Sequence, residues 1–142
     1  MDVIDTSSFT DTTYYVGRRR ENTVRSNGRS YVHITGPKAN VIRKACAIYL
    51  SRPATEKFRS LNGTTCRVLW DADSETFYLV KGWGVRLADT GAKAYVAIGT
   101  LLDELVDRYG YFTHLFLDES WDTDEHGRPV LVLKVNGEKV MA

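Results

Sequence analysis

The chain has 142 residues, 43% of them hydrophobic and 26% charged, with only 3 prolines, which excludes a disordered protein and predicts one globular domain over 1–142. No apolar run approaches the about 20 residues of a membrane span, and the acidic start lacks the pattern of a secretory signal, so we expect a cytoplasmic protein without a membrane partner. Cys46 and Cys66 lie too far apart for a zinc knuckle or a disulfide framework, which predicts buried thiols; no metal or cofactor is expected.

The net charge of +1 hides an uneven distribution of charge along the chain. Residues 1–60 carry 11 Lys and Arg against 5 Asp and Glu, a net charge of +6, whereas residues 61–142 carry 8 against 13, a net charge of −5. This asymmetry favours a charged partner for one face, or contact between the basic end of one copy and the acidic end of another. Two solvated faces of one fold explain it as well.

The first predicted elements are a polar arm over 1–12 and a β-hairpin over 13–34. Tyr14 and Tyr15 lie in a strand-like stretch, and Asn27-Gly28 is a two-residue turn signal. Arginines mixed with tyrosines are typical of nucleic-acid surfaces, because arginine neutralises phosphates while tyrosine stacks on bases. An acidic protein surface is the alternative partner for this basic patch. The predicted nucleic-acid or anion-binding residues here are Tyr15, Arg18, Arg19, Arg20, Arg25 and Arg29.

A helix is predicted next, over 38–50. Gly36-Pro37 suits a helix start, and the apolar residues from Val41 to Tyr49 fall on one helical stripe that ends before Pro53. A second hairpin follows, with strands at Cys66–Trp70 and Thr76–Val80 around an acidic turn. These elements make up the first half of the domain, 13–82.

The second half, 83–142, is predicted to begin with a short strand at 83–87. A helix is then expected over 92–109, because its apolar residues recur at i, i+3, i+4 and i+7 up to Gly110. The outer face of this helix is acidic, whereas that of the helix over 38–50 is basic. The two halves therefore differ in charge.

Two seven-residue segments, Thr35–Val41 and Thr90–Val96, agree at five positions and lie 55 residues apart. Each stands where a predicted strand leads into a predicted amphipathic helix followed by a hairpin. We therefore predict an α+β fold of two pseudo-duplicated strand–helix–hairpin units, with a mainly antiparallel sheet of about six to eight strands and both helices packed on one face. The free face or edge of the sheet would be open to a partner, including a second copy of the chain.

Both segments contain Thr-Gly-x-Lys at the predicted helix start. Unpaired backbone N–H groups at a helix start favour anions, glycine allows a ligand to approach, and lysine adds charge. Gly36, Lys38, Gly91 and Lys93 are therefore predicted to assist phosphate binding. Ordinary helix capping is the alternative interpretation of the same residues.

The last predicted element is an acidic hairpin, with strands at Thr113–Leu117 and Val130–Val135 around a polar loop over 118–129. The loop is similar to part of a calcium loop, but the expected glutamate position holds Leu133, which excludes an EF-hand. Its tryptophan is either tucked under the loop or exposed as a contact for a protein. The predicted protein-binding residues are Asp118, Glu119, Trp121, Asp122 and Asp124.

Two histidines suggest a catalytic interpretation. His33-Ile34-Thr35 resembles the His-x-Thr element of the two-histidine phosphoesterases, in which paired histidines act as acid and base on a phosphodiester. The resemblance implies His114 as the second histidine, although Leu115-Phe116 lacks the second hydroxyl residue. The alternative is that both are ordinary strand histidines.

The sequence therefore predicts a small binding protein that is not an enzyme. Nucleic-acid binding through the basic N-terminal hairpin is the first hypothesis. The second is a protein-interaction factor, an inhibitor or an assembly subunit that forms homo-oligomers, acting through the acidic hairpin. Phosphodiester cleavage by His33 and His114 is the third.

Overall fold

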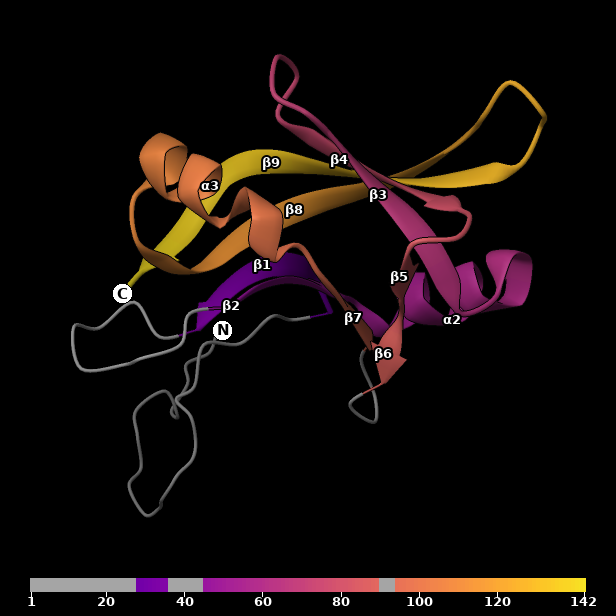
Figure 1. Cartoon of the computed structure of the whole chain (residues 1–142), viewed down its shortest axis with the longest axis horizontal. Helices are drawn as coiled ribbons and strands as arrows, with labels where there is room; N and C mark the ends of the chain where they lie inside the picture. Colours follow the sequence, from indigo (N-terminus) through magenta and orange to yellow (C-terminus); the bar gives the residue numbers. More distant parts are fainter. Residues whose placement is uncertain (1–27, 36–44, 90–93) are drawn as a thin grey trace, which may run out of the picture.

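The computed structural model describes residues 28–35, 45–89 and 94–142, and it folds them into a nine-stranded antiparallel sheet that curls into a nearly closed barrel (Figure 1). The order of strands in the sheet is β5-β3-β4-β9-β8-β1-β2-β7-β6. The strands are β1 (Ser30–Thr35), β2 (Ala45–Leu50), β3 (Thr65–Asp71), β4 (Thr76–Lys81), β5 (Val85–Arg86), β6 (Ala88–Asp89), β7 (Ala94–Ala97), β8 (Phe112–Thr123) and β9 (Pro129–Met141).

The barrel closes where the two ends of the sheet meet. The edge strands β5 and β6 follow each other in the chain with only Leu87 between them, and the Leu87 side chain is buried. The Leu87 N–H donates to Thr64 O at 2.8 Å, and β5 also lies against β7. One buried residue therefore joins the two edges of the sheet.

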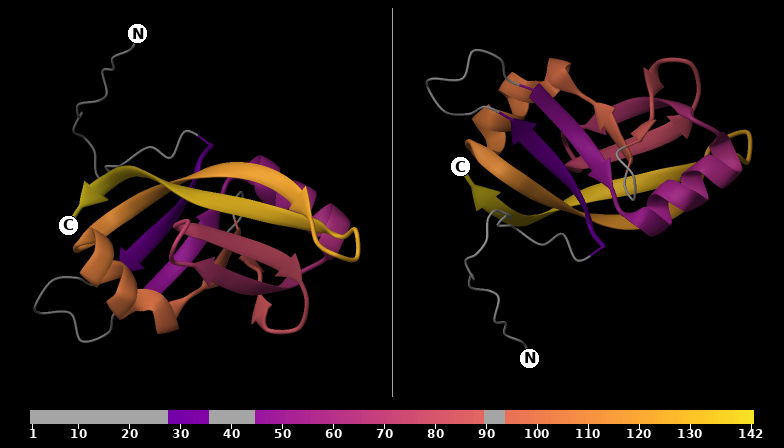
Figure 2. Two further views of the ribbon diagram at one scale, coloured as in Figure 1. Left: turned by 90° about the horizontal axis from the view of Figure 1, so that it is seen from above. Right: turned by 90° about the horizontal axis from the view of Figure 1, so that it is seen from below.

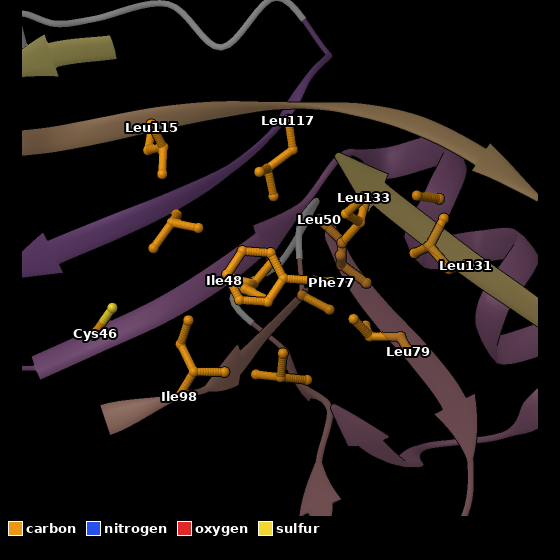
Figure 3. Packing of buried hydrophobic residues seen from close by; sticks show 14 of the residues in the cluster. Cys46, Ile48, Leu50, Phe77, Leu79, Ile98, Leu115, Leu117, Leu131 and Leu133 are labelled. Atoms are coloured by element: carbon orange, nitrogen blue, oxygen red, sulfur yellow. The ribbon is translucent and has the colours of Figure 1, made fainter. Parts of the chain in front are cut away.

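The barrel interior is filled by the inward side chains of alternating strand positions, because successive residues of a strand point to opposite faces. Phe77 of β4 lies in the middle of this core, with Ile48, Leu50 and Leu133 around it (Figure 3). Phe77 is fully buried and its ring centroid lies 4.4 Å from that of Trp70. The residues between these inward positions face outward and are available for a surface site.

Two short α-helices lie at opposite ends of the barrel (Figures 1 and 2). Helix α2 (Arg52–Asn62) begins at Ser51, whose Oγ accepts from the Ala54 N–H at 3.3 Å, and carries Pro53 in its first turn, where a missing N–H costs nothing. Its Phe58 is fully buried.

Helix α3 (Leu102–Tyr109) follows the 3₁₀ turn η2 (Gly99–Leu101) and ends at Gly110 with φ 81°. The Arg108 guanidinium donates to Ala72 O at 3.2 Å, which ties α3 to the turn between β3 and β4. Within the described residues no helix is long and apolar enough to cross a membrane.

The predicted α+β architecture is wrong. The sheet has nine strands and closes on itself, so its inner face is filled by its own side chains and has no place for a layer of helices. The helices instead cover the two ends of the barrel, each burying few residues. The segments Thr35–Val41 and Thr90–Val96 lie largely outside the described residues; the first described element after one is the strand β2, and the other ends within the strand β7.

The predicted helix over 38–50 is wrong where the structure describes it. Ala45–Leu50 forms β2, with Cys46, Ile48 and Leu50 buried at every second position. The same apolar residues fit a helical stripe, but their alternation fits a strand as well, and pairing with β1 and β7 decides for the strand. The helix α2, which begins at Arg52 and includes Pro53, was not predicted.

The predicted helix over 92–109 is correct only in its last part. Ala94–Ala97 forms β7 and η2 follows, so the α-helix begins at Leu102. The sequence of this stretch fits the helical period, but Ala94 and Val96 are both buried in the barrel, and their burial stabilises the strand.

The second and third hairpins are confirmed, as β3–β4 and β8–β9. The acidic loop is shorter than predicted, because Asp118–Thr123 continue β8 and pair with β9. Of the predicted hairpin over 13–34 the structure describes only the end, where β1 pairs with β2 on one side and with β8 on the other. Residues 1–27 lie outside the described residues.

Candidate functional site

A row of aromatic rings crosses the outer face of the barrel over the four adjacent strands β8, β1, β2 and β7. The rings stand at outward positions, next to inward residues such as Val32 and Ile48 that are fully buried. We call them the aromatic row. Its members are His114 and Phe116 of β8, Tyr31 and His33 of β1, Tyr49 of β2 and Tyr95 of β7.

The strand register brings these rings together. Tyr49 pairs with Tyr31 on one side and with Tyr95 on the other. Its ring is stacked on both, with centroids 5.3 Å from Tyr31 at an interplanar angle of 7° and 5.1 Å from Tyr95 at 24°. The Tyr31 ring continues the row to His114 at 4.7 Å and to Phe116 at 6.1 Å. Cross-strand neighbours thus form one continuous ring surface.

The tyrosine side chains of the row are half-buried. This burial raises the pKa of Tyr31 above its ordinary value, and the neighbouring phenol of Tyr49 raises it further. The pKa of Tyr49 is raised in the same way, by burial first and then by Tyr95. Both phenols therefore stay neutral at physiological pH, as a surface that stacks flat rings requires.

The two histidines of the row are direct cross-strand partners. His33 pairs with His114 in the register of β1 and β8, and their ring centroids lie 5.3 Å apart. Nδ1 of His33 lies 2.7 Å from Thr113 O, and Nδ1 of His114 lies 3.0 Å from Thr113 Oγ1. One threonine thus orients both imidazole rings.

Arg29 covers one end of the row. Its Cζ lies 4.0 Å from the centre of the Phe116 ring, and only 5% of Phe116 is exposed. The guanidinium also donates two hydrogen bonds to Glu138, at 3.1 and 2.5 Å, and these bonds hold the pKa of Glu138 below its usual value. Arg29 is therefore both a wall of the row and the partner of a carboxylate.

Most of the predicted phosphate-binding residues lie outside the described residues. Of that set the structure describes only Arg29. The residues it does not describe are Tyr15, Arg18, Arg19, Arg20, Arg25, Gly36, Lys38, Gly91 and Lys93.

The predicted protein-binding residues lie along β8 and its turn, and most have partners in the fold. Glu119 accepts from Ser30 Oγ, and Asp118 accepts from Asn136 Nδ2 at 3.0 Å. Trp121 is half-buried against the core, with Lys57 Nζ 4.5 Å from its ring centre. The tryptophan therefore lies against the barrel beside α2, and protein binding here stays a prediction.

The turn of this hairpin is organised by Asp124. Its Oδ1 accepts from the N–H groups of His126 at 2.8 Å and Arg128 at 2.9 Å, and its Oδ2 lies 3.2 Å from Arg128 Nε. These interactions, with the Arg128 N–H first, lower the pKa of Asp124. Asp122 Oδ1 accepts from the neighbouring Thr123 N–H at 2.8 Å. Asp124 and Asp122 thus shape the end of the hairpin.

No group of three or more metal-ligating side chains occurs in the part of the chain that the structure describes. Cys46 and Cys66 are buried free thiols, as predicted, and burial raises their pKa to about 12 and about 11. Comparisons with known protein families, with curated proteins and with solved structures give no match to this chain.

The sequence alone does not predict the aromatic row, although it singles out both histidines. Tyr49 and Tyr95 had been assigned to helices, where they would not be neighbours. The signal was present in the alternation of Ala45–Leu50 and Ala94–Ala97, where one tyrosine stands between two buried apolar residues. Reading both stretches as strands would have placed the two tyrosines on outward positions.

Proposed function

We propose that this protein binds single-stranded nucleic acid on the aromatic row. The observation that carries the proposal is the continuous stacking of rings over four strands, with Tyr49 in contact with Tyr31 and Tyr95. Unpaired bases stack on such rings, and each base–ring contact contributes about 1–3 kcal/mol to binding. A paired duplex hides its bases, so the row favours single strands.

The row is long enough for several successive bases to contact its outer side. Four neighbouring strands span three inter-strand distances, or about 14 Å. The outward position of the rings also supports a binding role, because a folded protein gains more from burying tyrosine than from leaving a connected row of rings half-exposed. Stacking is tolerant of sequence, so little base specificity is expected from the row alone.

Cations that could contact phosphates flank the row in the sequence. The connection between β1 and β2, residues 36–44, contains Lys38, Arg43 and Lys44 and no acidic residue. Arg25 stands five residues before Ser30, and five residues span at most about 17 Å. Two row strands are thus joined or preceded by basic segments, which fits the predicted basic patch as a source of phosphate contacts.

The test is a binding titration of a fluorescent oligothymidine of about 12 nucleotides, followed by anisotropy. Tyr49→Leu keeps an apolar side chain but removes the ring that joins Tyr31 to Tyr95, and we expect it to weaken binding about tenfold, as loss of one stacked base implies. Tyr49→Phe keeps the ring and should bind as the wild type does. Tyr78→Leu is the matched control, since Tyr78 is a half-buried tyrosine of β4, across the barrel.

A salt series separates stacking from phosphate contacts. With three phosphates neutralised, the logarithm of the binding constant should fall with the logarithm of salt concentration with a slope of about −2. Lys38→Gln should make that slope shallower without changing the thermal midpoint. Absence of binding at low salt, or equal effects of Tyr49→Leu and Tyr78→Leu, would refute the proposal.

A second candidate function is cleavage of a phosphodiester by His33 and His114. The side-by-side rings, 5.3 Å between centroids, favour it, since one phosphate can contact both. Thr113 contacts Nδ1 of each ring and so holds the two imidazoles side by side. Incubation with a single-stranded RNA tests this function: cleavage should be lost in both His33→Ala and His114→Ala. Intact RNA after prolonged incubation with wild-type protein would refute cleavage and leave nucleic-acid binding as the one proposed function.

A further inference from the structure

A second aromatic and basic surface lies at the seam where the barrel closes. It consists of Trp83, in the loop between β4 and β5, and three exposed cations, Arg67, Lys81 and Arg86. We call these four residues the tryptophan patch. Trp83 is 93% exposed, the most exposed of the large hydrophobic side chains that the structure describes. Tryptophan is enriched among the residues that dominate binding interfaces, and this ring is open to a partner.

The position of Trp83 is fixed by the glycines on either side of it. A Cβ on Gly84 would lie 3.1 Å from the main-chain oxygen of Cys66, and a Cβ on Gly82 would lie 2.9 Å from Cγ of Arg67. Both glycines therefore let the loop lie directly against β3. The backbone is held close to the barrel, and the indole ring between the two glycines extends into solvent.

The three cations of the patch lack acidic partners among the described residues. None of their side chains takes part in a hydrogen bond or an ion pair there. Arg86 pairs with Thr65 in the register of β3 and β5, and Arg67 lies two residues further along β3. Arg67 thus lies against the two glycines that flank Trp83, and Arg86 lies three residues along the chain from it, an arrangement that suits a base beside phosphates.

The patch is continuous with the aromatic row along the outer face of the barrel. Tyr95, the last ring of the row, pairs with Ala88 of β6, so the two residues lie about 5 Å apart. Arg86 is two residues before Ala88 on the same outer side, about 7 Å along the chain, because the buried Leu87 between them faces inward. A strand that leaves the row at Tyr95 therefore reaches Arg86 next.

We propose that the tryptophan patch is a second contact site for the same single-stranded nucleic acid, with Trp83 stacking on a base and Arg67 and Arg86 contacting the phosphates beside it. This inference rests on the proposed function of the aromatic row. It adds that the occupied site extends past the row and across the seam. A strand that covers only the row leaves Trp83 in water.

The test compares short and long oligothymidines, of about 4 and about 12 nucleotides, because only the longer one can reach both surfaces. Trp83→Ala should weaken binding of the long oligonucleotide about tenfold and leave that of the short one within twofold. Tyr49→Leu should weaken binding of both. Leu69→Ala, at another exposed apolar residue of the outer face, is the matched control and should change neither.

Tryptophan fluorescence gives an independent measurement. The long oligonucleotide should quench Trp83 emission and protect it from iodide, whereas the short one should not. Trp83→Phe should lose this signal while retaining most of the affinity, since phenylalanine still stacks.

The possible results separate the inference from the proposed function. Failure of both oligonucleotides to bind would overturn both. Binding that is weakened by Tyr49→Leu but unaffected by Trp83→Ala would overturn only the second contact site. A third result would also overturn the inference: Trp83→Ala leaves oligonucleotide affinity unchanged but converts a wild-type dimer into a monomer in sedimentation. The patch would then be a contact between two copies of this chain.

Discussion

Ser30 holds together the strands that carry the aromatic row, and its replacement gives a direct test of the fold. The side chain is fully buried. Its Oγ accepts from the Ser51 N–H at 2.9 Å and donates to the Glu119 carboxylate, so it connects β1, the start of α2 and β8. Ser30→Ala leaves a methyl group of similar size but deprives a buried N–H of its acceptor. We expect a loss of about 1–3 kcal/mol in the free energy of unfolding.

The assay is urea unfolding at neutral pH. With a denaturant slope of about 2 kcal/mol/M, a loss of about 2 kcal/mol lowers the midpoint by about 1 M at an unchanged slope. Glu119→Ala should lower the free energy of unfolding less than Ser30→Ala does, because Ser30 Oγ can still accept from the Ser51 N–H. Ser120→Ala is the control, since Ser120 is an exposed serine of β8 next to Glu119. Equal midpoints for Ser30→Ala and Ser120→Ala would refute the assigned network.

Three further predictions concern the core, the thiols and acid stability. Phe58→Ala should destabilise the fold by about 3–5 kcal/mol, whereas Leu61→Ala, on the exposed side of the same helix, should cost under about 1 kcal/mol in thermal or urea unfolding. Cys46 and Cys66 should resist a thiol reagent at about pH 8 in the folded protein and react in urea, because burial and a raised pKa leave almost no thiolate; rapid labelling of the native protein would contradict this. The pKa of Glu138 is lower in the folded than in the unfolded chain. Its ion pair with Arg29 therefore stabilises the fold at pH values above the unfolded pKa, and this stabilisation is lost as the pH falls through the folded pKa. The stability difference between wild type and Glu138→Gln should therefore narrow below about pH 4, and a constant difference would argue against the pair.

Local signals predicted those elements that are held together by neighbours in sequence. The hairpin of β3 and β4 follows from two β-branched and aromatic runs around Asp71–Ser74, where Asp71 Oδ1 accepts from the Asp73 N–H at 3.1 Å. The end of α3 was also predicted from a local signal, the glycine at position 110. These elements need little information from the rest of the chain.

Elements fixed by distant neighbours were not predicted. Ala45–Leu50 and Ala94–Ala97 are strands because they pair with each other in one sheet, although the paired residues are 44 or more positions apart in the chain. Their apolar residues fit both a helical and a strand period, and no local turn signal distinguishes the two. The error in fold class follows from these two segments.

The candidate site shares this dependence on distant pairing. Tyr31, Tyr49 and Tyr95 meet only because three strands from separate parts of the chain lie in register. His33 and His114, by contrast, were selected as a pair from the sequence, and the register places them opposite each other. Residue chemistry alone thus identified the pair, while the row needed the sheet.

The closing seam at Leu87 also bears on how the protein behaves in a crowded solution. Open ends of a sheet expose unpaired backbone N–H and C=O groups, onto which strands of other molecules can add during aggregation. Here the terminal strands β5 and β6 have two residues each and are linked through one buried residue. The two short strands cover the ends of β3 and β7, at Thr65 and Cys66 and at Ala94 and Tyr95. A Leu87→Asp substitution would be expected to open the seam and to promote fibre formation before it prevents folding.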